Sequence, residues 1–252
     1  MENAEKIKVI ILAAGKGTRM QSSEPKALTL LKGKAFLTHI LNTLETLDLP
    51  NKPIIVVGHQ KEKIIELLGD KYTYAHQAEQ LGTGNAVSST KEHIGHGEGL
   101  TIVLSSDQPL ISIETLTSLI NKHFKLKPTI TMGTATLPDF KDWREGLIKF
   151  GRIIRDKNNH LKDIVEFKNA TDKEKSVTEV NPAIYAFDNK WLWANINKIN
   201  NNNTQGEYLL TDLIKIACEQ NKKIETIKLS NILELLQPNT KEELEVLEEL
   251  VV

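Results

Sequence analysis

An apolar run leads directly into a glycine-containing loop near the start of the chain, in Val9-Ile10-Ile11-Leu12-Ala13-Ala14-Gly15-Lys16-Gly17-Thr18-Arg19-Met20. Branched apolar residues in succession are typical of a strand buried on both faces of a sheet. The small residues that follow leave the backbone uncrowded, so a bulky anion can approach the N–H groups. Arg19 and, further on, Lys26 add positive charge. The loop is therefore predicted to hold the phosphates of a ligand.

Two other glycine-rich phosphate loops are excluded by their spacing. A P-loop requires Gly-Lys-Ser/Thr after a first glycine and four further residues, and no stretch of the chain has this pattern. The dinucleotide-binding fingerprint requires a third glycine where Met20 stands. The two glycines by themselves are typical of a turn whose charged residues face the solvent. The whole stretch, followed by Lys26, favours a phosphate-binding site instead.

Composition narrows the classes of partner. Among 252 residues, Lys plus Arg number 32 and Asp plus Glu number 33, so no excess of charge favours nucleic acid or a membrane surface. No apolar run reaches the roughly 20 residues of a membrane span. The single cysteine, Cys218, excludes an internal disulfide and a cysteine metal site. We expect a cytoplasmic protein without nucleic-acid or membrane partners.

Strand-like and helix-like segments alternate through the first half of the chain, which predicts an α/β fold with a parallel sheet and helices on both faces. We expect one domain over residues 1–252, ending in a helix at about 240–252. Expected strands are 8–13, 53–57, 72–76, 100–105, 130–137, 180–187 and 223–229, with a hairpin at 152–156 and 161–167. Expected helices are 36–47, 61–68, 83–93, 112–125, 190–199, 208–219 and 241–252.

Together with Glu24-Pro25-Lys26, the first stretch resembles the signature L-x-A-G-x-G-T-R-M-x(5,6)-P-K of the sugar-1-phosphate nucleotidyltransferases. Further blocks, at 77–86, 151–153, 164–168 and 202–208, are similar to the N-acetylglucosamine-1-phosphate uridylyltransferase half of the bifunctional bacterial acetyltransferase/uridylyltransferases. The resemblance implies a Rossmann-like nucleotidyltransferase fold: a mixed, mostly parallel central sheet flanked by helices, with a β-hairpin insertion.

The resemblance also implies roles for individual residues. It assigns catalysis to Arg19 and Lys26 and a magnesium ion to Asp107 and Asn239. It assigns the nucleoside triphosphate to Leu12, Ala13, Ala14, Gly15, Gln77, Gly82 and Thr83, and the sugar 1-phosphate to Gly151, Glu166 and Asn181. Local sequence leaves alternatives open, because Asp107 suits a turn before proline and Asn239 suits a helix N-cap or a turn. Gln77 alone could be an ordinary loop residue.

The chain departs from the family at three places on the sugar side. Ser105-Ser106-Asp107 stands where the family has Tyr-Gly-Asp, residues 148–152 stand for Gly-Tyr-Gly-Arg, and Asn181-Pro182-Ala183 stands for Asn-Thr-Gly. We expect uridylyl transfer from UTP to N-acetylglucosamine 1-phosphate or a similar amino-sugar 1-phosphate. The alternatives are another sugar or base, or a catalytically silent nucleotide-sugar sensor. No hexapeptide repeat follows, so we expect no acetyltransferase domain and a monomer or weak homodimer.

Overall fold

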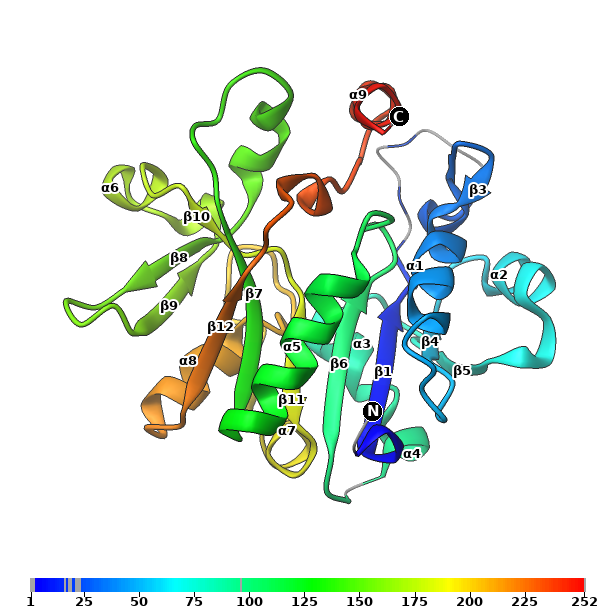
Figure 1. Ribbon diagram of the computed structural model, residues 1–252, viewed down its shortest axis with the longest axis horizontal. Coiled ribbons are helices and arrows are strands. Elements are labelled where there is room, and N and C mark those ends of the chain that lie inside the picture. Colours follow the sequence, from blue (N-terminus) through cyan, green and yellow to red (C-terminus); the bar gives the residue numbers. More distant parts are fainter. Residues whose placement is uncertain (1–2, 16, 18–19, 21–23, 96, 252) are drawn as a thin grey trace.

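A ten-stranded sheet runs through the molecule in the computed structural model, which describes residues 3–15, 17, 20, 24–95 and 97–251 (Figure 1). The strand order is β5-β4-β1-β6-β11-β7-β10-β8-β9, with β12 also paired to β7. The strands are β1 Ile7–Leu12, β4 Ile54–Val57, β5 Thr73–His76, β6 Leu100–Ser105, β7 Ile130–Thr136, β8 Arg152–Arg155, β9 Leu161–Val165, β10 Glu179–Val180, β11 Tyr185–Asp188 and β12 Ile224–Lys228; a separate pair is β2 Leu30–Leu31 with β3 Lys34–Ala35.

Parallel and antiparallel pairs divide the sheet. The β5-β4-β1-β6 part is parallel, whereas β11 runs antiparallel to both β6 and β7, and β12 is parallel to β7. The strands β8 and β9 form an antiparallel hairpin that projects at one side in Figure 1. The predicted fold class, a mixed and mostly parallel sheet with a hairpin insertion, is confirmed.

Helices cover both faces of the sheet. The α-helices are α1 Phe36–Glu45, α2 Lys61–Leu68, α3 Thr83–Ser88, α4 Lys91–Ile94, α5 Ile113–Leu126, α6 Asp172–Lys175, α7 Asn189–Asn195, α8 Asp212–Glu219 and α9 Lys241–Leu250. The short 3-10 helices are η1 Ala4–Lys6, η3 Lys26–Leu28, η4 Gly69–Lys71, η5 Asp142–Lys149, η6 Phe167–Asn169, η7 Ile196–Lys198 and η8 Ile232–Leu235.

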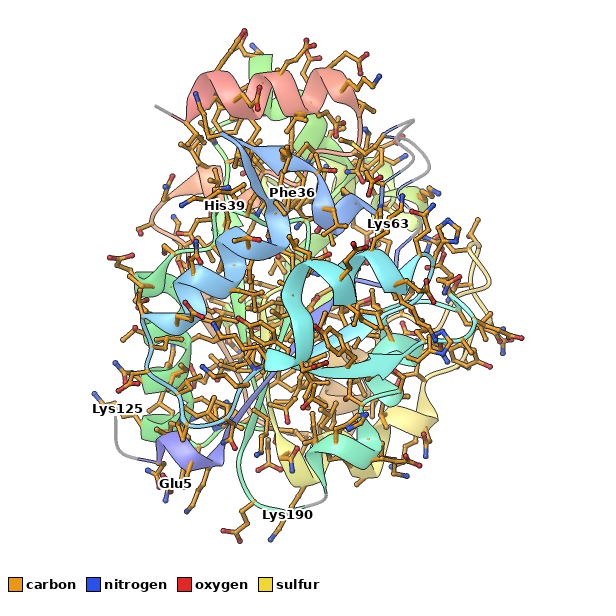
Figure 2. The ribbon with its side chains drawn as sticks, turned by 90° about the vertical axis from the view of Figure 1, so that its right-hand side faces the viewer. Glu5, Phe36, His39, Lys63, Lys125 and Lys190 are labelled. Carbon is orange, nitrogen blue, oxygen red and sulfur yellow. The ribbon has the colours of Figure 1, made fainter. Side chains whose placement is uncertain are left out.

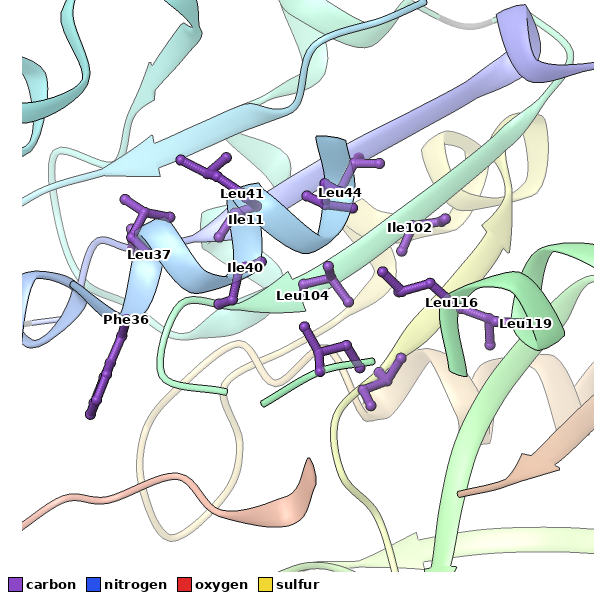
Figure 3. Close-up of a cluster of buried hydrophobic side chains, with 14 of the residues drawn as sticks. Ile11, Phe36, Leu37, Ile40, Leu41, Leu44, Ile102, Leu104, Leu116 and Leu119 are labelled. Carbon is purple, nitrogen blue, oxygen red and sulfur yellow. The ribbon is translucent and has the colours of Figure 1, made fainter. Parts of the chain in front are cut away.

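Side chains of β1 point alternately to the two faces of the sheet and join a hydrophobic core on each face. Val9 and Ile11 of β1 join the cluster under α1 and α5, whereas Ile10 joins the cluster under α3, α7 and α8. Figure 3 shows the first cluster, where side chains from α1 and α5 face Ile11 of β1 and two residues of β6. A strand that buries both faces needs no polar alternation, which is why the apolar run of residues 9–12 forms one.

Several charged side chains lie on the outside of this frame. In Figure 2, Glu5, Lys125 and Lys190 lie at the periphery, and all three are exposed, whereas Phe36 is fully buried. Across the part of the chain that the structure describes, no helix has the length and apolar character required to cross a bilayer.

Three predicted elements are corrected. The helix expected over 83–93 is two helices, α3 and α4, and the helix expected over 208–219 begins only at Asp212. The strand expected over 180–187 is interrupted between β10 and β11, because Pro182 has no backbone N–H and Ala183 takes a left-handed conformation with φ 58°. The C-terminal helix is observed at Lys241–Leu250, inside its predicted range.

Candidate active site

The loops after β1 and β6 meet at one edge of the sheet. Leu12 pairs in register with Ser105, and the backbone N–H of Ser106 donates to the Leu12 carbonyl at 3.0 Å. Because parallel strands end at the same edge, Gly15 and Asp107 come to line a single cavity of about 520 Å³. This volume lies within the range of roughly 300–1,000 Å³ that is usual for small-molecule sites.

Three residues that are far apart in the sequence converge in this cavity. The Lys26 ammonium donates to Asp107 Oδ2 at 2.5 Å and to Asn239 Oδ1 at 2.8 Å. The side chains of Lys26 and Asp107 are 12% and 22% exposed, so solvent screens this ion pair incompletely. Asn239 lies in the turn before α9, and its backbone N–H donates to Glu243 Oε2 at 2.7 Å. A cation is thus held between the two side chains predicted to bind a metal.

Gly17 allows Lys26 to reach this position. Gly17 has φ 59°, a left-handed conformation that L side chains rarely adopt. A Cβ at Gly17 would lie 2.8 Å from the Lys26 Cβ and 3.3 Å from its backbone nitrogen. The glycine therefore serves both the turn and the close return of the loop. Arg19, the other predicted catalytic residue, lies outside the residues that the structure describes.

The Asp107 and Asn239 pair suits a hard divalent cation. Asp107 Oδ1 is buried and has no hydrogen-bond partner among the described residues. Carboxylate and amide oxygens, completed by phosphates and water, are the ligands that Mg²⁺ prefers. No group of three or more His, Cys, Asp or Glu residues in the described part of the chain could hold a metal by itself. The arrangement accordingly fits a metal that arrives with a polyphosphate.

The block around Gln77 forms another wall of the same cavity. Gln77 is 5% exposed, and its side-chain amide group donates to the Gly82 carbonyl at 3.1 Å and to Asn85 Oδ1 at 2.8 Å. With both amide hydrogens engaged, the Gln77 side chain offers a ligand its carbonyl oxygen, which is an acceptor. Gly82 and Thr83 line the cavity beside it.

Residues 81–84 are fixed by the distant 205–210 segment. The Gly84 N–H donates to the Tyr208 carbonyl at 2.8 Å, and the Leu210 N–H donates to Thr83 Oγ1 at 2.9 Å. A Cβ at Gly82, whose φ is 110°, would lie 2.6 Å from the Tyr208 carbonyl oxygen. Two sequence blocks of the resemblance are therefore one structural unit, and Gly82 is required where they touch.

A second cavity adjoins the first. Leu12, Thr83 and Ser105 line both cavities. The second cavity also contains the three predicted sugar-binding residues, Gly151, Glu166 and Asn181. The site therefore has two compartments that share a wall formed by the three residues common to both, and Lys26 and Asp107 line the first compartment.

The polar groups of the second cavity differ in what they offer a ligand. Burial raises the pKa of Glu166, and the bond from Thr211 Oγ1 to its Oε1 is long, at 3.5 Å. Asn181 is already engaged: its amide nitrogen donates to the Tyr185 hydroxyl at 2.6 Å, and its Oδ1 accepts the Ala183 N–H at 3.0 Å. Glu166 is the freer acceptor for a ligand hydroxyl, whereas Asn181 shapes the wall.

Three further residues of this region were not predicted as site residues. Gln205 lines the second cavity, and its buried Oε1 has no partner among the described residues. Lys149 lines the same cavity and pairs with Glu243 at 3.1 Å. The block at 202–208 could have indicated Gln205. No local signal indicates the pair of Lys149 and Glu243, because packing of α9 against η5 brings these two residues together.

Comparison with known proteins gives matches over most of the chain. A family model described as the MobA-like NTP transferase domain matches residues 9–136. The bifunctional protein GlmU of Lactococcus lactis subsp. lactis (strain IL1403) is 42% identical over 207 residues, which are 82% of this chain and 43% of that protein. The protein of the same name from Streptococcus agalactiae serotype V is 41% identical over 230 residues, which are 91% of this chain and 48% of that protein.

The chain thus spans about half the length of the curated relatives it matches. Among solved structures, UDP-glucose pyrophosphorylase complexed with UDP-glucose superimposes with a TM-score of 0.77 at 15% identity, covering 96% of this chain and 97% of the other. At this identity the likeness concerns the fold, and it agrees with the layered sheet described above.

Proposed function

Because the chain belongs to the MobA-like NTP transferase domain family, we propose that it is a sugar-1-phosphate nucleotidyltransferase. The proposed reaction transfers a uridylyl group from UTP to N-acetylglucosamine 1-phosphate or a similar amino-sugar 1-phosphate. The GlmU relatives support this direction. The structural observation that carries the proposal is the Lys26 ammonium between Asp107 and Asn239, in a cavity that shares lining residues with the cavity of Glu166 and Asn181.

In this reaction an oxygen of the sugar phosphate attacks the α-phosphorus of UTP. A new P–O bond forms, the bond to the β-phosphate oxygen breaks, and pyrophosphate leaves with the electron pair. The nucleophile is already an anion, so no side chain has to remove a proton. Catalysis of this kind rests on alignment and charge neutralisation.

The residues of the site would divide these tasks. Lys26 would draw the two phosphates together and stabilise the charge that develops between them. Asp107 and Asn239 would hold Mg²⁺, which neutralises phosphate charge when bound. Arg19 would supply further charge to the triphosphate, as the sequence predicts. We propose a cytoplasmic location, where UTP is available as a substrate.

The orientation of Gln77 supports uracil as the base. Its free carbonyl oxygen can accept the ring N–H of uracil. Cytosine presents an acceptor nitrogen at that position, so two acceptors would face each other in a buried site. Such an unpaired contact typically costs about 1–3 kcal/mol, or roughly tenfold to 200-fold in selectivity.

Glu166 and the wall around it support a sugar with hydroxyl donors. The Glu166 carboxylate can accept from a hydroxyl, and Phe150, Val103 and Leu209 give the cavity an apolar side that suits a methyl group. An N-acetyl substituent offers both a polar amide and such a methyl. This combination is the reason for preferring an amino sugar over an unsubstituted hexose.

The experiment that tests the proposal is a matrix of triphosphates against N-acetylglucosamine 1-phosphate, with pyrophosphate release as the readout. We expect release with UTP, at least about tenfold less with CTP, and loss of release in Asp107→Ala at every triphosphate. Wild-type rates in Asp107→Ala would remove the metal assignment. If the wild type releases no pyrophosphate with any triphosphate, the alternative of a catalytically silent nucleotide-sugar sensor is favoured.

A further inference from the structure

Glu234 is a buried carboxylate that the proposed reaction does not use. It lies on η8 with 0% exposure. Its Oε1 accepts from Ser112 Oγ at 2.9 Å and from Thr115 Oγ1 at 3.0 Å, and its Oε2 accepts from the Ser112 N–H at 3.1 Å. Burying a carboxylate is costly unless its lone pairs are satisfied, so three donors on one side chain mark a specific contact.

This contact joins the two segments that carry the candidate metal ligands. Ser112 is the N-cap of α5, and the loop that leads into it carries Asp107. On the other side, Glu234 is followed by Asn239 after the short segment 235–238. The carboxylate also faces the N-terminal end of α5, where the helix dipole favours a negative charge.

A second link between the same segments is weaker. The Pro182 carbonyl accepts from Gln108 Nε2 at 2.7 Å and from Gln237 Nε2 at 3.4 Å. The Gln237 bond is near the limit for a hydrogen bond, so it restrains the turn only loosely. The bonds of Glu234 are the shorter connection between the Asp107 loop and the Asn239 turn.

The distance between these segments matters because a bound metal tolerates little displacement of its ligands. Asp107 Oδ2 and Asn239 Oδ1 both lie within 2.8 Å of one nitrogen atom, so they converge on a single point. Mg²⁺ demands near-octahedral geometry with oxygens at about 2.0–2.1 Å. A displacement of the Asn239 turn would therefore weaken the metal site before it unfolds the protein.

We propose that Glu234 is a positioning residue, which ties the Asn239 turn to the start of α5 so that Asn239 and Asp107 meet at one cation. The proposal rests on the proposed function only through the choice of those two ligands. It assigns to Glu234 an effect on metal affinity that exceeds its effect on the nucleotide or the sugar. Partners that orient metal ligands typically contribute 10- to 100-fold to affinity.

The test compares Glu234→Gln with the wild-type chain in direct Mn²⁺ binding by electron paramagnetic resonance, with UTP present and no sugar 1-phosphate. We expect the Mn²⁺ dissociation constant to rise about tenfold and the half-saturating Mg²⁺ concentration in turnover to rise in parallel. The KM values for UTP and sugar 1-phosphate at saturating Mg²⁺ should change less than about twofold, since neither substrate cavity is lined by Glu234.

Glu179→Gln is the matched control. Glu179 is a partly buried carboxylate, bonded to Arg155 at 2.6 and 2.8 Å, and it belongs to β10 rather than to either ligand segment. Its loss should lower the melting temperature and leave Mn²⁺ affinity unchanged. Thr115→Val removes one donor from the other end of the contact, so it should weaken Mn²⁺ binding in the same direction and add little to Glu234→Gln in the double variant.

Unchanged Mn²⁺ affinity in Glu234→Gln, or an equal loss in Glu179→Gln, would overturn the positioning role. If Glu234→Gln does not fold, Thr115→Val decides the matter by the same measurement. If Asp107→Ala binds Mn²⁺ as the wild type does, the cation lies elsewhere and this proposal fails with the metal assignment. Because the binding measurement involves no turnover, a failure of the nucleotidyltransferase assignment is seen separately in pyrophosphate release.

Discussion

Replacing Lys26 by methionine should strengthen cation binding to the free protein and at the same time weaken catalysis. In the structure the Lys26 ammonium occupies the place between Asp107 and Asn239 that a metal would take. A metal entering without nucleotide must first break both hydrogen bonds. When a triphosphate binds, the lysine can move onto its phosphates, and the two oxygens become available. Lys26→Met removes the competitor but also the charge needed at the reacting phosphorus.

The size of the effect follows from these contacts. A hydrogen bond to a charged group contributes about 1.5–3 kcal/mol, and solvation of the released lysine offsets part of the two bonds. A net gain equivalent to one such bond strengthens cation binding by about 10- to 100-fold. The expected loss in turnover is roughly 10²- to 10³-fold, the usual effect of removing one preorganised group that stabilises the transition state.

The assay is a Mn²⁺ titration of nucleotide-free wild type and Lys26→Met by electron paramagnetic resonance, with pyrophosphate release measured on the same preparations. Lys26→Met/Asp107→Ala serves as the control, because it lacks both the competing lysine and the anionic ligand. Tighter Mn²⁺ binding together with slower turnover is the predicted pair of results. Weaker or unchanged Mn²⁺ binding in Lys26→Met would mean that the lysine and the metal do not compete for one place.

Three other predictions concern groups around the site and in the core. Burial raises the pKa of Glu166, so its carboxylate takes up a proton at a higher pH than an ordinary Glu and then accepts hydrogen bonds less well. On acidification, the KM for sugar 1-phosphate should therefore rise more steeply in the wild type than in Glu166→Gln, and steady-state kinetics across the acidic range would show this. Ala183→Gly relieves the left-handed φ of 58° at some entropic cost, so calorimetry should find the melting temperature raised by roughly 2 °C, and a lower value would contradict the strain. Burial lowers the pKa of His123 to about 4, whereas the same imidazole in the unfolded chain has a pKa of 6.5, so the unfolded state binds more protons between these values. The free energy of unfolding should therefore fall by about 3 kcal/mol as the pH drops through this window. In denaturant titrations, His123→Asn should make the free energy of unfolding less dependent on pH.

The parallel part of the fold could be predicted because its signals are local. Residues 9–12 and 100–105 are apolar runs of strand length, and helical spacing follows each strand in turn. The rule that parallel strands end at one edge then placed Asp107 beside the first loop, and both line one cavity in the structure. The metal and substrate roles of these residues remain predictions.

The parts that were missed depend on contacts between distant segments. Residues 208–210 could continue helix α8 by pattern, but their backbone pairs with residues 81–84 instead. Pro182, which lacks a backbone N–H, is a local signal against one continuous strand over 180–187. Glu234 and Lys149 carry no recognisable motif, since their importance arises from how the last segments pack onto α5 and η5.

Uridylyl transfer to an amino sugar is tested by a competition for UTP between N-acetylglucosamine 1-phosphate and glucose 1-phosphate at equal concentration. Mg²⁺ is present, and the nucleotide products are identified by mass spectrometry. The two acceptors differ at the sugar 2-position, so the product ratio reports how the cavity around Glu166 and Asn181 reads that position. We expect UDP-N-acetylglucosamine to predominate and Asp107→Ala to form neither product. Predominance of UDP-glucose would contradict the amino-sugar assignment, and the absence of any UDP-sugar would contradict the proposed reaction itself.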